Sequence, residues 1–271
     1  MFKSKKRKLG LILFLALSML LAACGKDEKA STTNSSKNAL EQIKERDKIV
    51  IGVKYDTRLF GLKNPTSGEV EGFDIDISKQ LAKEILGDEK KVEFKEVTSK
   101  TRIPMLNNGD IDAIVATMTI SEERKKEVDF SDVYFDAGQS LLVKKGSPIK
   151  GLQDLKKGTK VLAVKGSTSA INIREKAPDA TVLEYENYTE AFTALKSGQG
   201  DALTTDDSIL YGMVDQDPNY QLVGGTFTEE PYGIAVKKGN KELVDAINNA
   251  LKKMKEDGRY DEIKNKWIKT N

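Results

Sequence analysis

Short apolar, β-branched runs alternate along the chain with longer amphipathic stretches, and this alternation is typical of strands followed by helices. The first such pair is a strand at 48–53 and a helix at 73–86, in which Ile77, Leu81 and Ile85 share one face. The other predicted strands are 92–97, 113–115, 161–164, 182–185, 202–203 and 232–236. The other predicted helices are 102–108, 121–128, 169–176, 188–197, 206–214, 241–256 and 260–267. The pattern predicts an α/β fold.

The alternation of strands and helices restarts after 134–144, which indicates two α/β units. The last strand and the two C-terminal helices are expected to return to the first unit. We therefore predict two lobes with mixed sheets. Lobe 1 is formed by 39–142 and 231–271, and lobe 2 by 143–230. Two crossing strands, near 138–143 and 230–234, are expected to act as a hinge.

The N-terminus has the pattern of a secretory signal peptide. Five basic residues within 3–8 precede an apolar run at 9–21, which is too short to span a bilayer, and small residues follow up to Cys24. We predict a signal peptide at 1–23. The segment 24–38 is rich in Lys, Ser, Thr and Asn, so it is expected to form a flexible tether.

Cys24 is the only cysteine in the chain, so it cannot form an internal disulfide. Its position resembles that of the acylated cysteine in bacterial lipoproteins; the other interpretation is an incidental cysteine in an ordinary signal peptide. The resemblance implies a lipid anchor at Cys24, which would hold the protein on the outer face of the cell membrane.

Charge and composition exclude several function classes. The nominal charge of +2 comes from the N-terminus, because removing residues 1–23 leaves 39 basic and 42 acidic residues, a formal charge of −3. No basic stripe with interleaved aromatics remains, so we predict no nucleic-acid partner. The chain has no histidine, which excludes Ser-His-Asp and Cys-His catalysis and His-ligated zinc. No phosphate-binding Walker sequence and no acidic calcium loop occurs, so we predict no cofactor, no metal and no catalytic residues.

Eight segments, spread over most of the chain, together resemble the polar amino-acid-binding proteins of ABC importers, the solute-binding protein family 3. They are IVIGV at 49–53, EGFDID at 71–76, DIDA at 110–113, TMTISEER at 117–124, DFS at 129–131, GQGDA at 198–202, YGIA at 232–235 and GRYDEI at 258–263. The resemblance implies a two-lobed, type II periplasmic-binding-protein-like fold that closes around an amino acid. It also implies delivery to an ABC permease with its ATPase, and a monomer.

An amino-acid receptor must supply a cation for the α-carboxylate and an anion for the α-ammonium of its ligand. The resemblance assigns the carboxylate to Arg124, helped by the Thr119 N–H. It assigns the ammonium to the Thr119 hydroxyl, the Thr117 carbonyl and Asp206. Sequence pattern alone leaves Arg124 as a surface charge and Asp206 as a helix N-cap.

Thr168 and Ser169 follow a predicted strand and open a helix, where backbone N–H groups can face an anion. A capped turn is the alternative, and the resemblance makes both residues ligand contacts. It also places Phe60 against the ligand and the Tyr188 hydroxyl near its side chain.

The predicted side-chain pocket departs from the glutamine-binding pattern, because Ser99 and Arg102 replace an aromatic and an apolar residue. Lys54 and Arg102 match positions at which aspartate- and glutamate-binding members carry cations. Two cations favour a second carboxylate, so the expected ligand is glutamate or aspartate. A glutamine or asparagine receptor is the alternative within transport, and a dehydratase-like enzyme on the same fold is the alternative outside it. A signalling receptor is not expected, because no membrane-spanning segment follows Asn271.

Overall fold

The computed structural model describes residues 37–268, and these residues build two five-stranded sheets. The first sheet has the order β5-β1-β6-β13-β7, in which β1, β5 and β6 are parallel and β13 runs antiparallel to β6 and β7. Its strands are β1 (Ile49–Val53), β5 (Val92–Glu96), β6 (Ala113–Ile114), β7 (Val128–Ala137) and β13 (Glu230–Lys237). The predicted mixed α/β class is confirmed.

The second sheet has the order β10-β9-β11-β8-β12, with β9, β10 and β11 parallel and β8 antiparallel to its neighbours. Its strands are β8 (Gln139–Lys144), β9 (Lys160–Val164), β10 (Thr181–Tyr185), β11 (Ala202–Asp206) and β12 (Tyr220–Val223). A third, small sheet of two- and three-residue strands was not predicted. It contains β2 (Asp56–Thr57), β3 (Gly61–Lys63) and β4 (Val70–Glu71).

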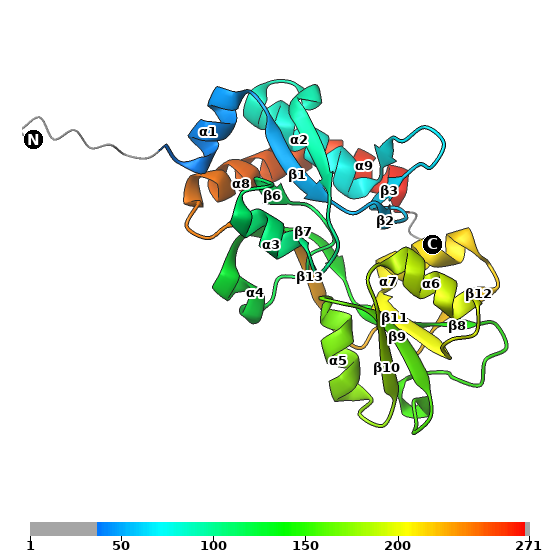
Figure 1. Cartoon of the computed structure of the whole chain (residues 1–271). Coiled ribbons are helices and arrows are strands. Elements are labelled where there is room, and N and C mark those ends of the chain that lie inside the picture. The colour runs from blue at the N-terminus through cyan, green and yellow to red at the C-terminus, as the bar shows by residue number, and fades with distance from the viewer. Residues whose placement is uncertain (1–36, 269–271) are drawn as a thin grey trace, which may run out of the picture. The chain divides into compact units, whose positions relative to one another are not determined.

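Helices cover both large sheets (Figure 1). Those with the first sheet are α1 (Ala39–Arg46), α2 (Phe73–Leu86), α3 (Arg102–Asn108), α4 (Glu122–Glu127), α8 (Lys241–Glu256) and α9 (Arg259–Trp267). Those with the second are α5 (Thr168–Lys176), α6 (Tyr188–Lys196) and α7 (Asp207–Gln216). Two single 3-10 turns complete the elements, Glu89–Lys91 and Leu152–Asp154. Among these helices α1 was not predicted, although Asn38 and Glu41 form a capping box at its start.

The chain crosses between the sheets twice. It leaves the first sheet at Ala137 and enters the second at Gln139, and it returns between Val223 and Glu230. At the first crossing, a Cβ on Gly138 would lie 2.6 Å from the carbonyl oxygen of Thr228 in the second crossing. The two crossings therefore touch at a point where only glycine fits.

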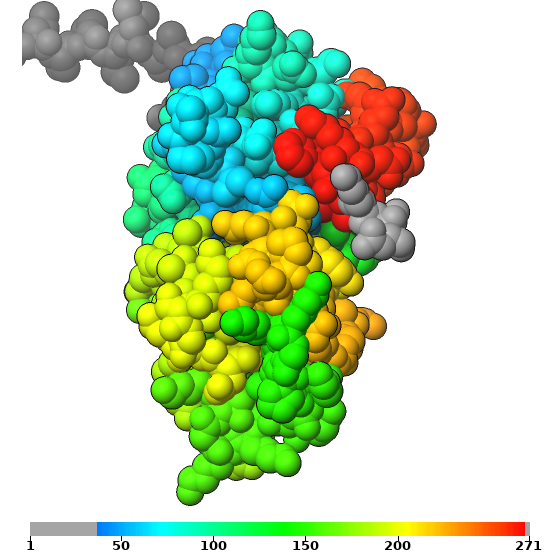
Figure 2. Space-filling model, turned by 90° about the vertical axis from the view of Figure 1, so that its right-hand side faces the viewer, coloured from blue at the N-terminus to red at the C-terminus, as the bar shows by residue number. Residues whose placement is uncertain are grey.

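We refer to 37–137 and 230–268 as the first lobe, and to 139–223 as the second lobe. These limits differ from the predicted ones, because residues 139–142 pair with β11 and β12 and Glu230 pairs with Ala137. Figure 2 shows the blue-to-cyan N-terminal part and the red C-terminal helices together in one half of the molecule. The predicted signal peptide, Cys24 and the tether up to residue 36 lie outside the described residues.

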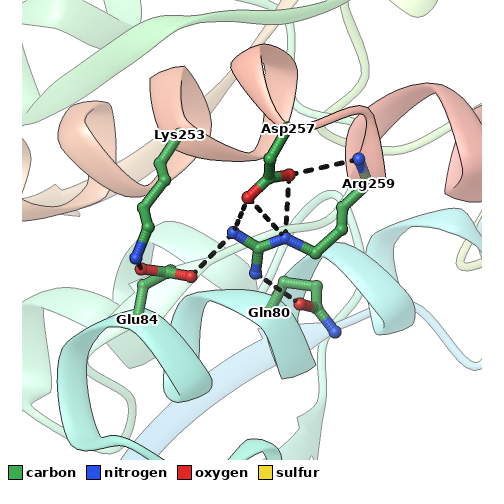
Figure 3. A network of polar contacts seen from close by, with 5 residues as sticks. All are labelled: Gln80, Glu84, Lys253, Asp257 and Arg259. Atoms are coloured by element: carbon green, nitrogen blue, oxygen red, sulfur yellow. Dashed lines mark hydrogen bonds and ion pairs between the residues drawn. The ribbon is translucent and has the colours of Figure 1, made fainter.

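A polar network joins α2 to the two C-terminal helices (Figure 3). The Arg259 guanidinium bonds the Asp257 carboxylate, Glu84 Oε1 at 2.8 Å and Gln80 Oε1 at 2.8 Å. Lys253 donates to Glu84 Oε2 at 2.7 Å. Because Arg259 bonds residues of α2 and of the segment between α8 and α9, it ties the two C-terminal helices to α2 within the first lobe.

Replacing Arg259 with alanine is expected to lower the free energy of unfolding by about 1–2 kcal/mol, because several charge-assisted hydrogen bonds are lost together. Lys252→Ala is the matched control, since Lys252 is an exposed helical lysine whose partner Glu256 is 3.8 Å away. It should change stability by less than about 0.5 kcal/mol. Urea unfolding followed by circular dichroism measures both. Equal losses in the two variants would show that the network contributes nothing specific.

Candidate functional site

Arg124 is buried between the lobes. Ser121 caps α4 by accepting the Arg124 N–H at 3.2 Å, and this places the arginine in the first turn with its side chain pointing inward. Its Nη1 donates to the Thr119 carbonyl at 2.8 Å and its Nη2 to the Gly166 carbonyl of the second lobe at 3.2 Å. Burial lowers the pKa of Arg124, and Asp206 raises it. The residue is not the solvated surface charge that the sequence pattern allowed.

Gly166 brings the second lobe close to the first. It has a φ of +76°, and a Cβ there would lie 2.8 Å from the carbonyl oxygen of Ser99. Glycine is needed at this position for both reasons. The turn that precedes α5 can therefore approach the first lobe closely enough for Arg124 to reach it.

Asp206 ends β11 at the N-cap position of α7, but its side chain makes no cap hydrogen bond. Its Oδ2 accepts from the Tyr232 hydroxyl at 2.6 Å, whereas its buried Oδ1 has no partner within residues 37–268. Burial raises the pKa of Asp206 to about 7, and nearby Glu230 contributes to the increase. A buried carboxylate oxygen without a donor is costly, so this atom is suited to accept from a ligand.

The threonines of the predicted site meet across the two lobes. Thr119 Oγ1 lies 3.5 Å from Thr168 Oγ1. Thr168 also donates to Glu230 Oε2 at 2.8 Å and accepts from Gln139 Nε2 at 3.1 Å. Ser169 is buried, and its hydroxyl bonds Ser167 Oγ at 2.9 Å within its own turn. Its predicted contact with the ligand remains a prediction.

The two cations of the predicted side-chain pocket are buried. Lys54 Nζ donates to Ser99 Oγ at 2.8 Å and lies 4.9 Å from the centroid of the Tyr188 ring. Burial lowers the pKa of Lys54 to about 8 and that of Arg102 to about 9. Arg102 Nη1 donates to the Ala116 carbonyl at 2.8 Å, and its Nε has no partner among the described residues.

Tyr188 and Phe60 border this region. The Tyr188 hydroxyl accepts from Thr205 Oγ1 at 3.0 Å, and burial raises the pKa of the tyrosine. Phe60 is fully buried in an aromatic cluster, with ring centroids 5.9 Å from Phe73, 5.2 Å from Phe135 and 6.0 Å from Tyr232. Phe73 lies in the core of the first lobe. The contacts of Phe60 and Tyr188 with a ligand stay predictions.

Two buried carboxylates, Asp74 and Glu230, were not predicted as part of the site. Asp74 accepts the Thr117 N–H at 3.0 Å and the Tyr134 hydroxyl at 2.9 Å, and burial raises its pKa to about 7. Glu230 Oε2 accepts a hydrogen bond from the Thr168 hydroxyl, and the residue is 2% exposed. In the sequence, Asp74 looks like an ordinary acidic residue in the first turn of a helix. Only its position within the EGFDID segment could have indicated a role in the site.

Asp56 was also missed, and it links the lobes. Its Oδ2 accepts the backbone N–H of Tyr188, the first residue of α6, at 2.6 Å. Near it, Arg58 Nε pairs with Asp215 Oδ2 of α7 at 2.7 Å. Together with the contact of Arg124 with Gly166, these bonds hold the lobes against each other.

The site contains every buried charged side chain within residues 37–268. They are the cations Lys54, Arg102 and Arg124 and the carboxylates Asp74, Asp206 and Glu230. Three positive and three negative groups thus share one buried region. Such a region can pair both ends of a zwitterion without adding net charge to the interior.

The described residues show neither a helix able to cross a membrane nor a group of three or more His, Cys, Asp or Glu side chains that could hold a metal ion.

The chain matches the family model of the bacterial extracellular solute-binding proteins, family 3, over residues 49–270. It is 74% identical over 253 residues to the ABC transporter glutamine-binding protein GlnH of Bacillus subtilis (strain 168), covering 93% of each chain. It is 62% identical over 246 residues to a glutamine-binding protein of Geobacillus stearothermophilus, covering 87% of this chain and 94% of the relative.

A solved structure described as an ancestral arginine-binding protein bound to glutamine is 48% identical to this chain, with a TM-score of 0.77. The match covers 82% of this chain and 98% of the solved chain. The type II periplasmic-binding-protein fold expected from the sequence is confirmed. Because the family model matches most of the chain and a relative is 74% identical over 93% of it, the chain belongs to the bacterial extracellular solute-binding proteins, family 3.

Proposed function

We propose that this protein is the binding component of an amino-acid ABC importer and that it captures L-glutamine. The observation that carries the proposal is the charge balance of the site. Glutamine is a zwitterion with a neutral side chain, so with all six groups ionised it leaves the three buried cations and the three buried carboxylates balanced. Glutamate would add one uncompensated negative charge, which is expensive in a desolvated site.

The sequence led us to expect glutamate or aspartate as the ligand, and we now favour the alternative, a glutamine receptor. The sequence interpretation counted Lys54 and Arg102 as two unmatched cations, because nothing in the local pattern marked Asp74 and Glu230 as buried. Two relatives with high identity are named as glutamine-binding proteins, which supports the amide. The relatives are binding proteins, which likewise supports transport over the dehydratase-like alternative.

In the proposed complex the α-carboxylate lies against the Arg124 guanidinium and the Thr119 N–H. The α-ammonium donates to the free Oδ1 of Asp206, to the Thr119 hydroxyl and to the Thr117 carbonyl. The ligand side chain extends toward Lys54 and Tyr188. Each end of the zwitterion thus meets a buried group of opposite charge, and the free carboxylate oxygen gains a donor.

Ligand contacts from both lobes would stabilise the closed arrangement, which a permease then recognises. Arg124, Thr119 and Thr117 come from the first lobe, whereas Asp206 and Thr168 come from the second. The two touching crossings at Gly138 and Thr228 serve as the hinge. A monomer, anchored outside the cell through lipid on Cys24, would deliver glutamine to its permease.

The first test is calorimetric titration of the chain from Gly25, which retains the whole unit Lys37–Asn271, with L-glutamine, L-asparagine, L-glutamate and L-aspartate. We expect glutamine to bind at least about tenfold more tightly than glutamate, since one uncompensated charge costs more than about 1.4 kcal/mol. D-Glutamine is the control for stereochemistry. Tighter binding of glutamate would restore the acidic assignment, and no binding of any amino acid would refute the receptor function.

A further inference from the structure

One peptide group at the site is held at both ends by buried charges. The Ala116 carbonyl oxygen accepts from Arg102 Nη1 at 2.8 Å, and the Thr117 N–H donates to Asp74 Oδ2 at 3.0 Å. This carbonyl and this N–H belong to the same planar peptide unit and point in opposite directions. A cation on one side and an anion on the other therefore fix the orientation of the plane.

The residue that follows this peptide has a strained backbone. Thr117 has a φ of +46°, in the left-handed region that β-branched residues rarely adopt. This conformation costs about 1–2 kcal/mol for an L-residue, so surrounding contacts must hold it. The peptide held by Asp74 and Arg102 is the one that sets the φ of Thr117.

The two charged side chains are themselves fixed. Asp74 lies in the first turn of α2 and receives a second hydrogen bond at Oδ1 from Tyr134, at 2.9 Å. Arg102 begins α3, and Nη1 also approaches the Thr117 carbonyl at 3.5 Å. Asp74 is 0% and Arg102 2% exposed, so water does not screen their bonds to the peptide.

We infer that Asp74 and Arg102 are positioning residues that hold the Ala116–Thr117 peptide and thereby aim the Thr117 carbonyl at the ligand ammonium. This inference rests on the proposed function and deepens it. It also explains why a site for a neutral side chain contains Arg102, because at least one donor of this arginine serves the protein backbone.

The test measures glutamine binding to Asp74→Ala, with and without Thr117→Gly, in the chain from Gly25. Asp74→Ala is expected to weaken glutamine about tenfold, because the left-handed Thr117 conformer falls to about a tenth of the population. Glycine adopts positive φ readily, so Thr117→Gly in the Asp74→Ala background should restore affinity to within about threefold of wild type. The carbonyl of residue 117 is still present in the glycine variant.

Tyr134→Phe is the matched control, since it removes the other hydrogen bond of the same carboxylate and leaves the Thr117 bond in place. It should keep wild-type affinity while losing stability. Arg102→Met, which keeps the apolar stem and removes the donors, should weaken glutamine as well and should respond to Thr117→Gly in the same direction. This second variant tests the inference should Asp74→Ala not fold.

Wild-type affinity in Asp74→Ala, or a loss that Thr117→Gly does not reverse, would overturn the positioning role. Equal losses in Tyr134→Phe and Asp74→Ala would do the same, because general destabilisation would then explain both. All these outcomes require that the wild-type chain binds glutamine. Failure of the wild type to bind refutes the proposed function instead, so the two failures are distinguishable.

Discussion

Replacing Arg124 with alanine is expected to weaken the binding of every amino acid about 1000-fold. Arg124 is 8% exposed and its guanidinium interacts with the charges of Asp206 and Glu230, so its removal deletes the cation for the α-carboxylate and leaves two acids facing the ligand. Breaking a buried ion pair from one side costs about 3–5 kcal/mol. Calorimetry with glutamine and, as competitors, the other polar amino acids measures the loss.

Lys125→Ala is the matched control for Arg124→Ala. Lys125 is the next residue of α4, its side chain is 49% exposed and it pairs with Glu122 on the surface. This variant should bind glutamine as the wild type does, because surface pairs contribute little. If Arg124→Ala retained affinity within tenfold of Lys125→Ala, the α-carboxylate would have to bind elsewhere.

Replacing Asp206 with asparagine is expected to weaken glutamine about 100-fold. The substitution keeps the shape and an acceptor oxygen but removes the negative charge that faces the ammonium. Asp207→Asn is the neighbouring control, because Asp207 Oδ1 accepts the Gly138 N–H and an amide oxygen can accept the same bond. Similar affinities of Asp206→Asn and wild type would exclude Asp206 as the counter-ion.

The same carboxylate makes the affinity depend on pH. Burial and Glu230 raise the pKa of free Asp206 to about 7, while the Tyr232 hydroxyl and Arg124 oppose the shift. The ligand ammonium favours the ionised form, so binding lowers this pKa and releases a proton below pH 7. Glutamine affinity should therefore fall as the pH drops from 8 to 5, by up to about tenfold per unit. Asp74 has a similar pKa, and comparison with Asp206→Asn, which should show a shallower dependence, isolates the Asp206 contribution.

Elements with a long amphipathic pattern were predicted well from the sequence. The helix at 73–86 and the short helix at 102–108 begin and end as predicted, because each has a glycine in the left-handed conformation after its last residue. Most of the missed elements are short, and the exception is β7, which has ten residues. Helix α1 has eight residues, and the strands of the small third sheet have two or three, so neither gives a periodic signal.

The structure brings predicted site residues such as Arg124, Thr119 and Asp206 into one buried region, but the sequence did not predict the other acids that share it. The family resemblance indicated Arg124, Thr119 and Asp206 as site residues. In the structure Arg124 is buried, whereas its neighbours in α4 are exposed. Asp74 and Glu230 were missed because local pattern does not reveal which acid is buried. Burial depends on partners distant in sequence, since Asp74 bonds Thr117 and Tyr134 and Glu230 bonds Thr168.

The position of β13 between β6 and β7 affects the order in which the two sheets can form. The first sheet joins strands from 49–53 to 230–237, so its central part cannot be completed until most of the polypeptide is available for pairing. The second sheet uses one continuous segment, 139–223, and can form earlier. A chain stalled before residue 230 would therefore expose β6 and β7 as unpaired edges, which are targets for aggregation and proteolysis.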